Sequence, residues 1–120
     1  MPVLDITEQN FEDVIEQNQI IFIDFWASWC VPCQSFEKIY YEVASQNTDI
    51  MFGKIDVEAQ QVIADTFSIR SIPHLLVFKK GIVIYSDSGS LPKKGLEELV
   101  DQARDADMSK LEDQIDANDK

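Results

Sequence analysis

The stretch Ile20–Cys33, IIFIDFWASWCVPC, decides the fold of this 120-residue chain and contains its only two cysteines. It begins with a run rich in Ile, Phe and Trp, which predicts a buried strand. Beyond Cys33, apolar residues recur at the spacing of a helix: Phe36, Ile39, Tyr40, Val43 and Ala44. We therefore expect Cys30 at or just before the N-terminus of a helix that follows a strand, and Cys33 in the first turn of that helix.

This position favours one particular chemistry of the cysteine pair. The free N–H groups of a first helical turn carry partial positive charge, which stabilises a thiolate beside them. We expect Cys30 to be the exposed nucleophile of low pKa and Cys33 to be the resolving thiol. Pro32 fits between them, because proline has no N–H to lose and fixes φ for a first helical turn. A C-x-x-C pair between a strand and a helix predicts a redox-active disulfide.

Two other uses of the cysteines are less compatible with the sequence. A zinc site needs about four ligands, typically Cys or His, and the chain has two Cys and one His. A purely structural disulfide is disfavoured because closing so short a loop removes little entropy from the unfolded chain.

Asp24 is the unusual residue of the first strand. One interpretation places its side chain on a solvated face of that strand. The other buries it under the cysteine pair, with a raised pKa that suits a proton relay to and from Cys33. Lys54, in a further predicted strand over Ile50–Val57, is expected either to face Asp24 or to be an exposed strand lysine.

Composition limits the partners and the setting. The net charge is −12, from 22 acidic and 10 basic residues, which argues against nucleic acid or an anionic membrane as partner. No apolar run approaches the roughly 20 residues that span a bilayer. The N-terminal MPVLDITEQN lacks the basic start and apolar core of a secretory signal. We expect one domain, monomeric and cytoplasmic.

The remaining elements follow from turn signals and periodicity. A short strand is predicted over Val3–Ile6, and Thr7 is predicted to cap a helix over Glu8–Gln17. A helix over Glu58–Phe67 is expected to turn Val62, Ile63 and Phe67 inward. A hairpin is predicted from strands His74–Lys79 and Ile82–Tyr85, with the second extending to Tyr85 or beyond, and a loop over Ser86–Leu91. Pro92 can start a last helix, whose buried stripe is predicted to be Leu96, Leu99, Val100 and Ala103.

This order predicts an α/β fold with a central mixed sheet of four to five strands and helices on both faces. We assign residues 1–106 to the domain and residues 107–120 to an acidic C-terminal tail. The tail is predicted to be frayed or a helical extension. Alternatively, its apolar residues form a docking helix for a partner: Met108, Leu111 and Ile115.

Taken together, these residues resemble the thioredoxin family from about Thr7 to Ala106. The matching motifs, in chain order, are Asp24-Phe25-Trp26-Ala27, Trp29-Cys30-Val31-Pro32-Cys33, Lys54 with Asp56, Ile72-Pro73 before a strand, Lys80-Gly81 and Gly89. The resemblance implies a thioredoxin fold. It also implies a cis Pro73 against the cysteines and a buried proton-handling pair of Asp24 and Lys54.

The resemblance further implies a flat apolar surface that receives the substrate protein, formed by Trp29, Val31, Pro32, Ile72, Pro73 and Gly89. Three residues depart from the family pattern. Val31 stands where Gly is usual, and Lys38 where most members have a helix-kinking Pro. His74 follows Pro73 where Thr is common. These departures bear on the redox potential and the choice of partners, and they leave the predicted chemistry in place.

The expected function is therefore reduction of protein disulfides by a Cys30/Cys33 dithiol–disulfide cycle, a role in electron transport and cell redox homeostasis. The family implies no bound cofactor, with NADPH used indirectly through a thioredoxin reductase. One rival is a membrane-tethered thiol reductase of cytochrome maturation, against which the absent N-terminal anchor argues. The other is a thioredoxin-like adaptor or chaperone-partner module, which would not need its cysteines.

Overall fold

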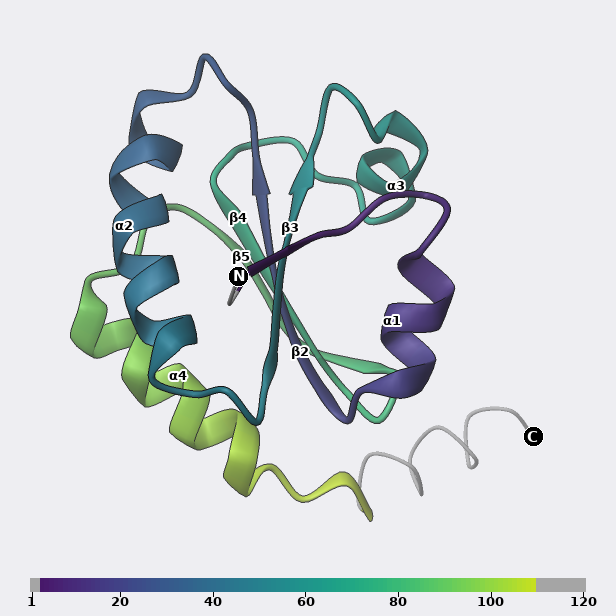
Figure 1. Ribbon diagram of the computed structural model, residues 1–120, viewed down its shortest axis with the longest axis vertical. Helices are drawn as coiled ribbons and strands as arrows, with labels where there is room; N and C mark the ends of the chain where they lie inside the picture. The colour runs from purple at the N-terminus through teal and green to yellow at the C-terminus, as the bar shows by residue number, and fades with distance from the viewer. Residues whose placement is uncertain (1–2, 110–120) are drawn as a thin grey trace.

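The computed structural model describes residues 3–109 and folds them around a five-stranded sheet with helices on both sides (Figure 1). The strands are β1 (Val3–Asp5), β2 (Ile20–Trp26), β3 (Met51–Asp56), β4 (His74–Lys79) and β5 (Ile82–Ser88). The helices are α1 (Phe11–Gln17), α2 (Val31–Ser45), α3 (Gln61–Thr66) and α4 (Lys93–Asp105). The predicted α/β class and mixed sheet are confirmed.

The strand order in the sheet is β1-β3-β2-β4-β5, with β2 at its centre. β3 runs parallel to both β1 and β2, whereas β4 runs antiparallel to β2 and pairs with β5 as the predicted hairpin. Asp24 of β2 lies opposite Lys54 of β3 on one side and Leu75 of β4 on the other. The cysteine-bearing segment therefore leaves the central strand of the sheet.

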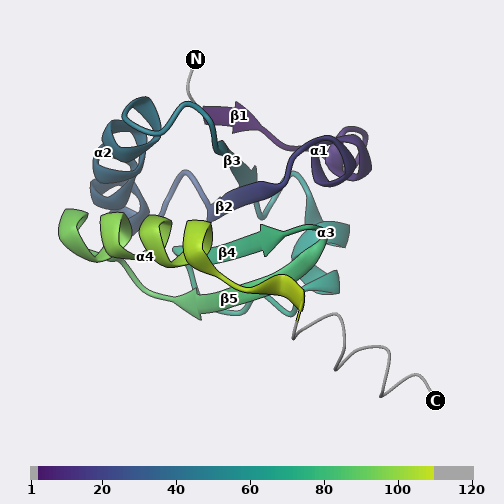
Figure 2. The same cartoon turned by 90° about the horizontal axis from the view of Figure 1, so that it is seen from below.

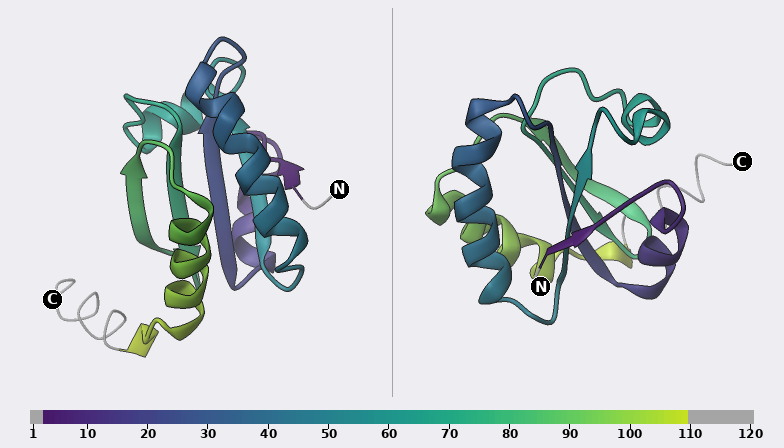
Figure 3. Two further views of the ribbon diagram at one scale, coloured as in Figure 1. Left: turned by 90° about the vertical axis from the view of Figure 1, so that its left-hand side faces the viewer. Right: turned by 45° about the horizontal axis from the view of Figure 1, so that its top comes forward.

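Alternate side chains of β2 point to two separate cores. Phe22 packs with α2 and α4 on one face, whereas Ile21, Ile23 and Phe25 pack with α1 and α3 on the other. Figures 2 and 3 show these two helix layers on opposite sides of the sheet. Because side chains alternate along a strand, Asp24 points to the same side as Phe22, toward α2.

Three boundaries or faces differ from the prediction. The first helix begins at Phe11 rather than Glu8, because Thr7 starts a turn in which its hydroxyl accepts a hydrogen bond from the Asn10 N–H at 3.3 Å.

Val62, predicted to point inward, is 65% exposed, since α3 is only six residues long and buries Ile63 and Ala64 instead. β5 continues to Ser88, through part of the predicted loop, because the register with β4 extends to His74 opposite Ser88.

Helix α2 is continuous from Val31 to Ser45, so no break occurs at Lys38. Cys30 is its N-cap residue, as predicted, and Pro32 lies in the first turn. Pro92 is likewise the N-cap residue of α4. The predicted stripe of α4 is buried at Leu96, Val100 and Ala103 and partly buried at Leu99.

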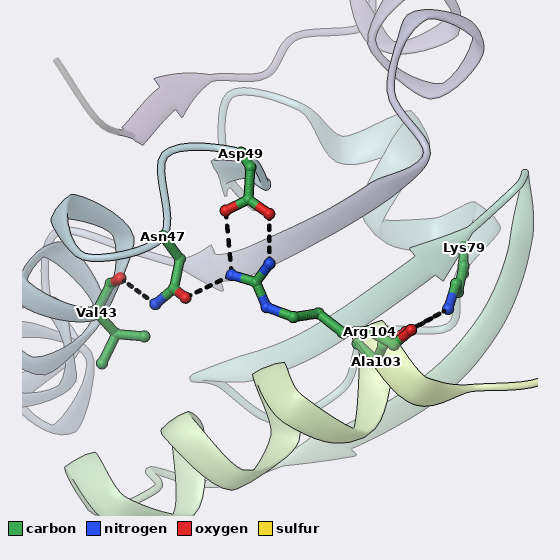
Figure 4. Close-up of polar contacts among 6 residues, drawn as sticks. All are labelled: Val43, Asn47, Asp49, Lys79, Ala103 and Arg104. Carbon is green, nitrogen blue, oxygen red and sulfur yellow. Dashed lines mark hydrogen bonds and ion pairs between the residues drawn. The ribbon is translucent and has the colours of Figure 1, made fainter.

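The C-terminal end of α4 is held by side chains from two other elements (Figure 4). The ammonium of Lys79 donates hydrogen bonds to the main-chain carbonyls of Ala103, Arg104 and Ala106. The Arg104 guanidinium binds the Asp49 carboxylate in the loop after α2. Packing continues to Met108, which is buried. Most of the predicted tail, residues 110–120 with Leu111 and Ile115, lies outside the described residues.

None of the helices within residues 3–109 is long and apolar enough to cross a lipid bilayer.

Candidate active site

Cys30 and Cys33 form a disulfide at the point where β2 gives way to α2, with their Cα atoms 5.2 Å apart. A tight turn after β2 brings the chain to the helix, and the Cys30 N–H donates to the Ala27 carbonyl at 3.1 Å. The N–H of Cys33 then donates to Cys30 Sγ at 3.2 Å. The first turn of α2 therefore directs a main-chain donor, and the positive end of the helix dipole, at the sulfur of Cys30.

Around the disulfide, the residues next to Cys30 in sequence are exposed, whereas the two cysteines are buried. Trp29 and Val31 are 66% and 67% exposed, whereas Cys30 is 4% and Cys33 2% exposed. The expectation of an exposed Cys30 is wrong for this disulfide form, because the sulfurs pack into a small apolar cluster with Ala27 and Ile72. Only a slight difference in exposure separates the two cysteines.

The loop before β4 lies directly against the disulfide. The Ile72–Pro73 peptide bond is cis, as the resemblance implied, and the Ile72 carbonyl oxygen lies 3.8 Å from Cys30 Sγ. Gly89 joins this loop, because its N–H donates to the Pro73 carbonyl at 2.7 Å. Pro73 itself is buried, whereas Pro32 and Gly89 are exposed. The predicted substrate surface is thus brought together at one end of the sheet.

Asp24 is buried beneath this end of the sheet, at 3% exposure, which excludes the solvated-face interpretation. Burial raises its pKa from 3.8 to about 8; the nearby negative charge of Glu37 raises it too, whereas Lys54 lowers it. Within the described part of the chain, Asp24 Oδ1 has no hydrogen-bond partner. A buried carboxyl with a pKa this close to neutrality can take up and release a proton at physiological pH.

Lys54 is adjacent to Asp24 across β2 and β3, but its ammonium turns elsewhere. Lys54 Nζ donates to the Tyr41 hydroxyl at 2.7 Å and lies 3.8 Å from the Asp5 carboxylate. It also lies over the Trp26 ring, 5.2 Å from the centroid. Lys54 therefore acts on Asp24 through its charge, and the structure contains no direct ion pair between the two.

A cavity of about 110 Å³ connects these groups. Its lining includes Asp24, Cys33, Lys54 and one residue that the sequence analysis did not single out, Glu37. The full lining is Asp24, Trp26, Ala27, Ser28, Cys33, Gln34, Glu37 and Lys54. Helical spacing contained a signal for Glu37, since it follows Cys33 by four residues and so shares its face of α2.

His74 lies at the rim of the site and is partly buried. Its Nε2 is hydrogen-bonded to the Ser86 hydroxyl at 2.8 Å, and its ring lies at 84° to that of Phe25, with the two centroids 6.2 Å apart. Burial lowers the pKa of His74, although the charge of Asp87 opposes this. His74 is absent from the lining of the Asp24 cavity.

Within residues 3–109, no group of three or more His, Cys, Asp or Glu side chains is arranged to hold a metal ion.

The comparisons with known proteins agree with this geometry. The sequence profile of the family described as Thioredoxin matches residues 2–102. The chain belongs to the thioredoxin family. It is 38% identical over 108 residues to a protein named "Putative thioredoxin 2" from Streptomyces coelicolor, an alignment that covers 90% of this chain and 81% of that protein.

Another sequence relative and a solved structure also match this chain. The chain is 35% identical to the thioredoxin of Bacillus subtilis, over 85% of this chain and 98% of that one. Among solved structures, a thioredoxin variant from Halobacterium salinarum superposes with a TM-score of 0.80 at 29% identity, covering 88% of this chain and 93% of that chain. The fold is the thioredoxin fold, and the Cys30–Cys33 pair matches the family's C-x-x-C active site.

The protein is accordingly a thiol–disulfide oxidoreductase that reduces protein disulfides through the Cys30/Cys33 pair. Thioredoxin-family proteins act on disulfide substrates.

Proposed function

We propose that Cys30 is the nucleophile of this reaction and Cys33 the resolving thiol. The Cys30 thiolate attacks one sulfur of a substrate disulfide, forms a mixed disulfide and releases the first substrate thiolate. Cys33 then loses its proton and attacks Cys30 Sγ. The bond between Cys30 and the substrate breaks, the second substrate thiolate leaves, and the Cys30–Cys33 disulfide remains. Two electrons thus pass from the protein to its substrate.

The assignment of Cys30 rests on one observation, the hydrogen bond from the Cys33 N–H to Cys30 Sγ. A main-chain donor and a helix N-terminus both stabilise negative charge on that sulfur. Cys33 supplies the donor, and no corresponding main-chain N–H is directed at its own sulfur in the described structure. Cys30 is therefore the thiol we expect to ionise first.

We assign Asp24 the role of proton acceptor for Cys33. Both side chains line the same cavity, and the pKa of Asp24 is raised to about 8. The ordinary pKa of a thiol is about 8.5, so the proton moves between groups of similar affinity, either directly or through water in the cavity. In this proposal Lys54 acts together with Asp24: its positive charge lowers the pKa of Asp24 and so opposes the effect of burial.

The substrate surface in this proposal consists of exposed and partly exposed residues around the disulfide together with the buried Pro73: Trp29, Val31, Pro32, Ile72, Pro73 and Gly89. Trp29 and Val31 protrude beside sulfurs that are themselves buried, so a substrate segment that contacts these side chains is brought to Cys30. Hydrogen bonds to the main chain near Ile72 would align an extended segment of the substrate protein.

A thioredoxin reductase using NADPH would return two electrons and two protons to the disulfide, and no cofactor would bind this chain. The family match supports this source of electrons, and the net charge of −12 favours protein partners over nucleic acid or anionic membrane. We assign the protein to the cytoplasm as a monomer, with a role in electron transport and cell redox homeostasis.

The test of the cysteine roles uses Cys33→Ser and Cys30→Ser variants as a matched pair. When each is mixed with a disulfide-containing protein, Cys33→Ser should accumulate a mixed disulfide that persists on non-reducing gels, whereas Cys30→Ser should trap little. Equal trapping, or more trapping by Cys30→Ser, would contradict the assignment.

The same preparations test the source of electrons. The parent protein should reduce insulin at the expense of NADPH when a bacterial thioredoxin reductase is added, and neither single-cysteine variant should turn over. Full in vivo function of a Cys30→Ser variant would instead favour the adaptor role.

A further inference from the structure

The cavity beside Asp24 contains a second carboxylate, that of Glu37. Glu37 comes from α2, one turn beyond Cys33, and lines the cavity together with Asp24, Cys33 and Lys54. Glu37 is half-buried, whereas Asp24 is enclosed. The described part of the chain provides Glu37 with no ion-pair partner within salt-bridge distance, although its charge also acts on Lys54 in the same cavity and raises the pKa of that lysine.

We propose that Glu37 is a positioning residue for proton transfer, and that its carboxylate sets the pH range in which Asp24 takes up the Cys33 proton. This inference rests on the proposed role of Asp24 as the proton acceptor for Cys33. Glu37 does not touch the reacting sulfurs in this role. It acts on Asp24 through the cavity that both residues line.

The pKa of this buried carboxyl is sensitive to a nearby charge, because one of its oxygens lacks a hydrogen-bond partner. Asp24 Oδ1 has no hydrogen-bond partner in the described structure, and the residue is only 3% exposed. In a poorly solvated site a neighbouring charge is screened less than it is in water. A negative charge at the cavity therefore makes Asp24 a stronger base, in addition to the effect of burial.

The other charged and titratable groups around Asp24 do not cancel this effect. From β3, Lys54 acts in the opposite direction, but its effect on the pKa of Asp24 is smaller than that of Glu37. Its ammonium binds Tyr41 of α2 and lies near Asp5 of β1.

The remaining neighbours contribute no opposing charge. Tyr40 of α2 is fully buried, and its pKa is raised well above its usual range, first by burial and then by the charge of Asp24. Its hydroxyl donates to the Gly53 carbonyl. From β4, the residue opposite Asp24 is the apolar Leu75. Glu37 is thus the strongest charged influence on Asp24.

The chemical consequence is a match between donor and acceptor. When Cys33–S–H gives its proton to the Asp24 carboxylate, the S–H bond breaks, an O–H bond forms, and Cys33–S⁻ is free to attack Cys30. The transfer is easiest when the two groups have similar proton affinities. Without the charge of Glu37, Asp24 would be a weaker base, and the step would need a larger rise in free energy.

The direct test is a carboxyl ¹³C NMR titration of Asp24 in the oxidised full-length protein, in which the cysteines do not titrate. The Asp24 signal is assigned by its loss in Asp24→Asn. Glu37→Gln should lower the Asp24 midpoint by roughly half to one pH unit. The matched control is Glu42→Gln, which removes the same charge from the same helix at an exposed position paired with Lys93 and should leave the midpoint unchanged. An equal midpoint in both variants would overturn the proposal.

The kinetic test follows oxidation of the reduced protein by a saturating small disulfide in stopped-flow tryptophan fluorescence, with the rate measured from pH 5.5 to 9. Glu37→Gln should move the midpoint of the pH–rate profile down by the same amount as the NMR midpoint, whereas Glu42→Gln should follow the parent. A Glu37→Gln profile identical to that of the parent, with Asp24→Asn slowed, would overturn the role of Glu37 alone. An Asp24→Asn rate equal to the parent's would overturn the relay and this inference together.

Discussion

Asp24 and Lys79 are the two acidic or basic residues that the structure buries within positions 3–109, and they lie in neighbouring strands at opposite ends of the sheet. Asp24 lies near the carboxyl end of β2 beneath the disulfide. Lys79 ends β4, on the side of the sheet where α4 terminates (Figure 4). Burial alone would mark both residues as unusual in the same way.

Their hydrogen bonds separate them. Lys79 Nζ donates to three carbonyls at the end of α4: Ala103 at 2.7 Å, Arg104 at 2.9 Å and Ala106 at 3.0 Å. An ammonium has three protons, and the last carbonyls of a helix lack partners of their own. The ammonium supplies three donors and the helix end three acceptors, so Lys79 has a structural role.

Asp24 has the opposite arrangement. One of its oxygens has no partner in the described structure, its charge is destabilised by burial, and it faces a cavity shared with Cys33. A buried charged residue whose polar atoms lack hydrogen-bond partners is thus a candidate for a role in the reaction. One whose polar atoms all have partners is a candidate for a structural role. Three substitutions test this distinction.

The largest expected effect is a gain of stability in Asp24→Asn. The pKa of Asp24 is 3.8 ordinarily and about 8 in the folded protein. Below about pH 4, Asp24 is protonated in both states. As the pH rises from about 4 to 8, the unfolded chain ionises freely and the folded one does not, so the free energy of unfolding falls. Asp24→Asn should remove this loss and gain up to about 5 kcal/mol at pH 8.

Urea unfolding at pH 5 and pH 8 measures this difference. The gain should be small at pH 5 and large at pH 8, and the exposed Asp65→Asn of α3 serves as control. A parent protein whose stability does not decline toward pH 8 would show that Asp24 is better solvated than its burial indicates. The relay predicts that Asp24→Asn also slows the resolution of mixed disulfides more than their formation.

Lys79→Met should have the next largest effect, in the opposite direction. The substitution leaves three helix-terminal carbonyls without a charged donor, at a cost of about 2 to 4 kcal/mol. The melting temperature should fall by roughly 10 °C, while the rate of insulin reduction at 25 °C is retained. The neighbouring exposed Lys80→Met is the matched control. A loss of activity without a loss of stability would mean that Lys79 is more than an anchor for α4.

Lys54→Gln should have the smallest effect and sharpens the assignment of Asp24. Removing the lysine charge should raise the pKa of Asp24, because Lys54 lowers it in the parent. The expected shift is a few tenths of a pH unit, smaller than the opposite shift in Glu37→Gln. A carboxyl NMR titration measures both. A larger shift in Lys54→Gln would place the lysine closer to Asp24 in solution than the Tyr41 contact allows.

Much of the site could be predicted because it is local in sequence. The apolar run of β2, the C-x-x-C pair and the helical spacing after it predicted Cys30 at or just before the N-terminus of α2, where it is the N-cap residue. Strand and helix periodicities are visible within about ten residues. The strand His74–Lys79 was predicted with its exact bounds, because turn signals flank its apolar run on both sides. The cis Pro73 came only from the family resemblance.

The sequence by itself determined which residues have reactive groups, their order along the chain and the periodicity of the elements that hold them. Only the tertiary structure decided how their charges are paired. It turned Lys54 toward Tyr41, directed Lys79 to the end of α4 and brought Glu37 to the cavity of Asp24. The contacts of Lys54 and Lys79 depend on elements far apart in sequence, where burial and the nearest available partner determine the pairing. The spacing of Glu37 from Cys33 indicated a shared face of α2, but not the strand residues that meet that face.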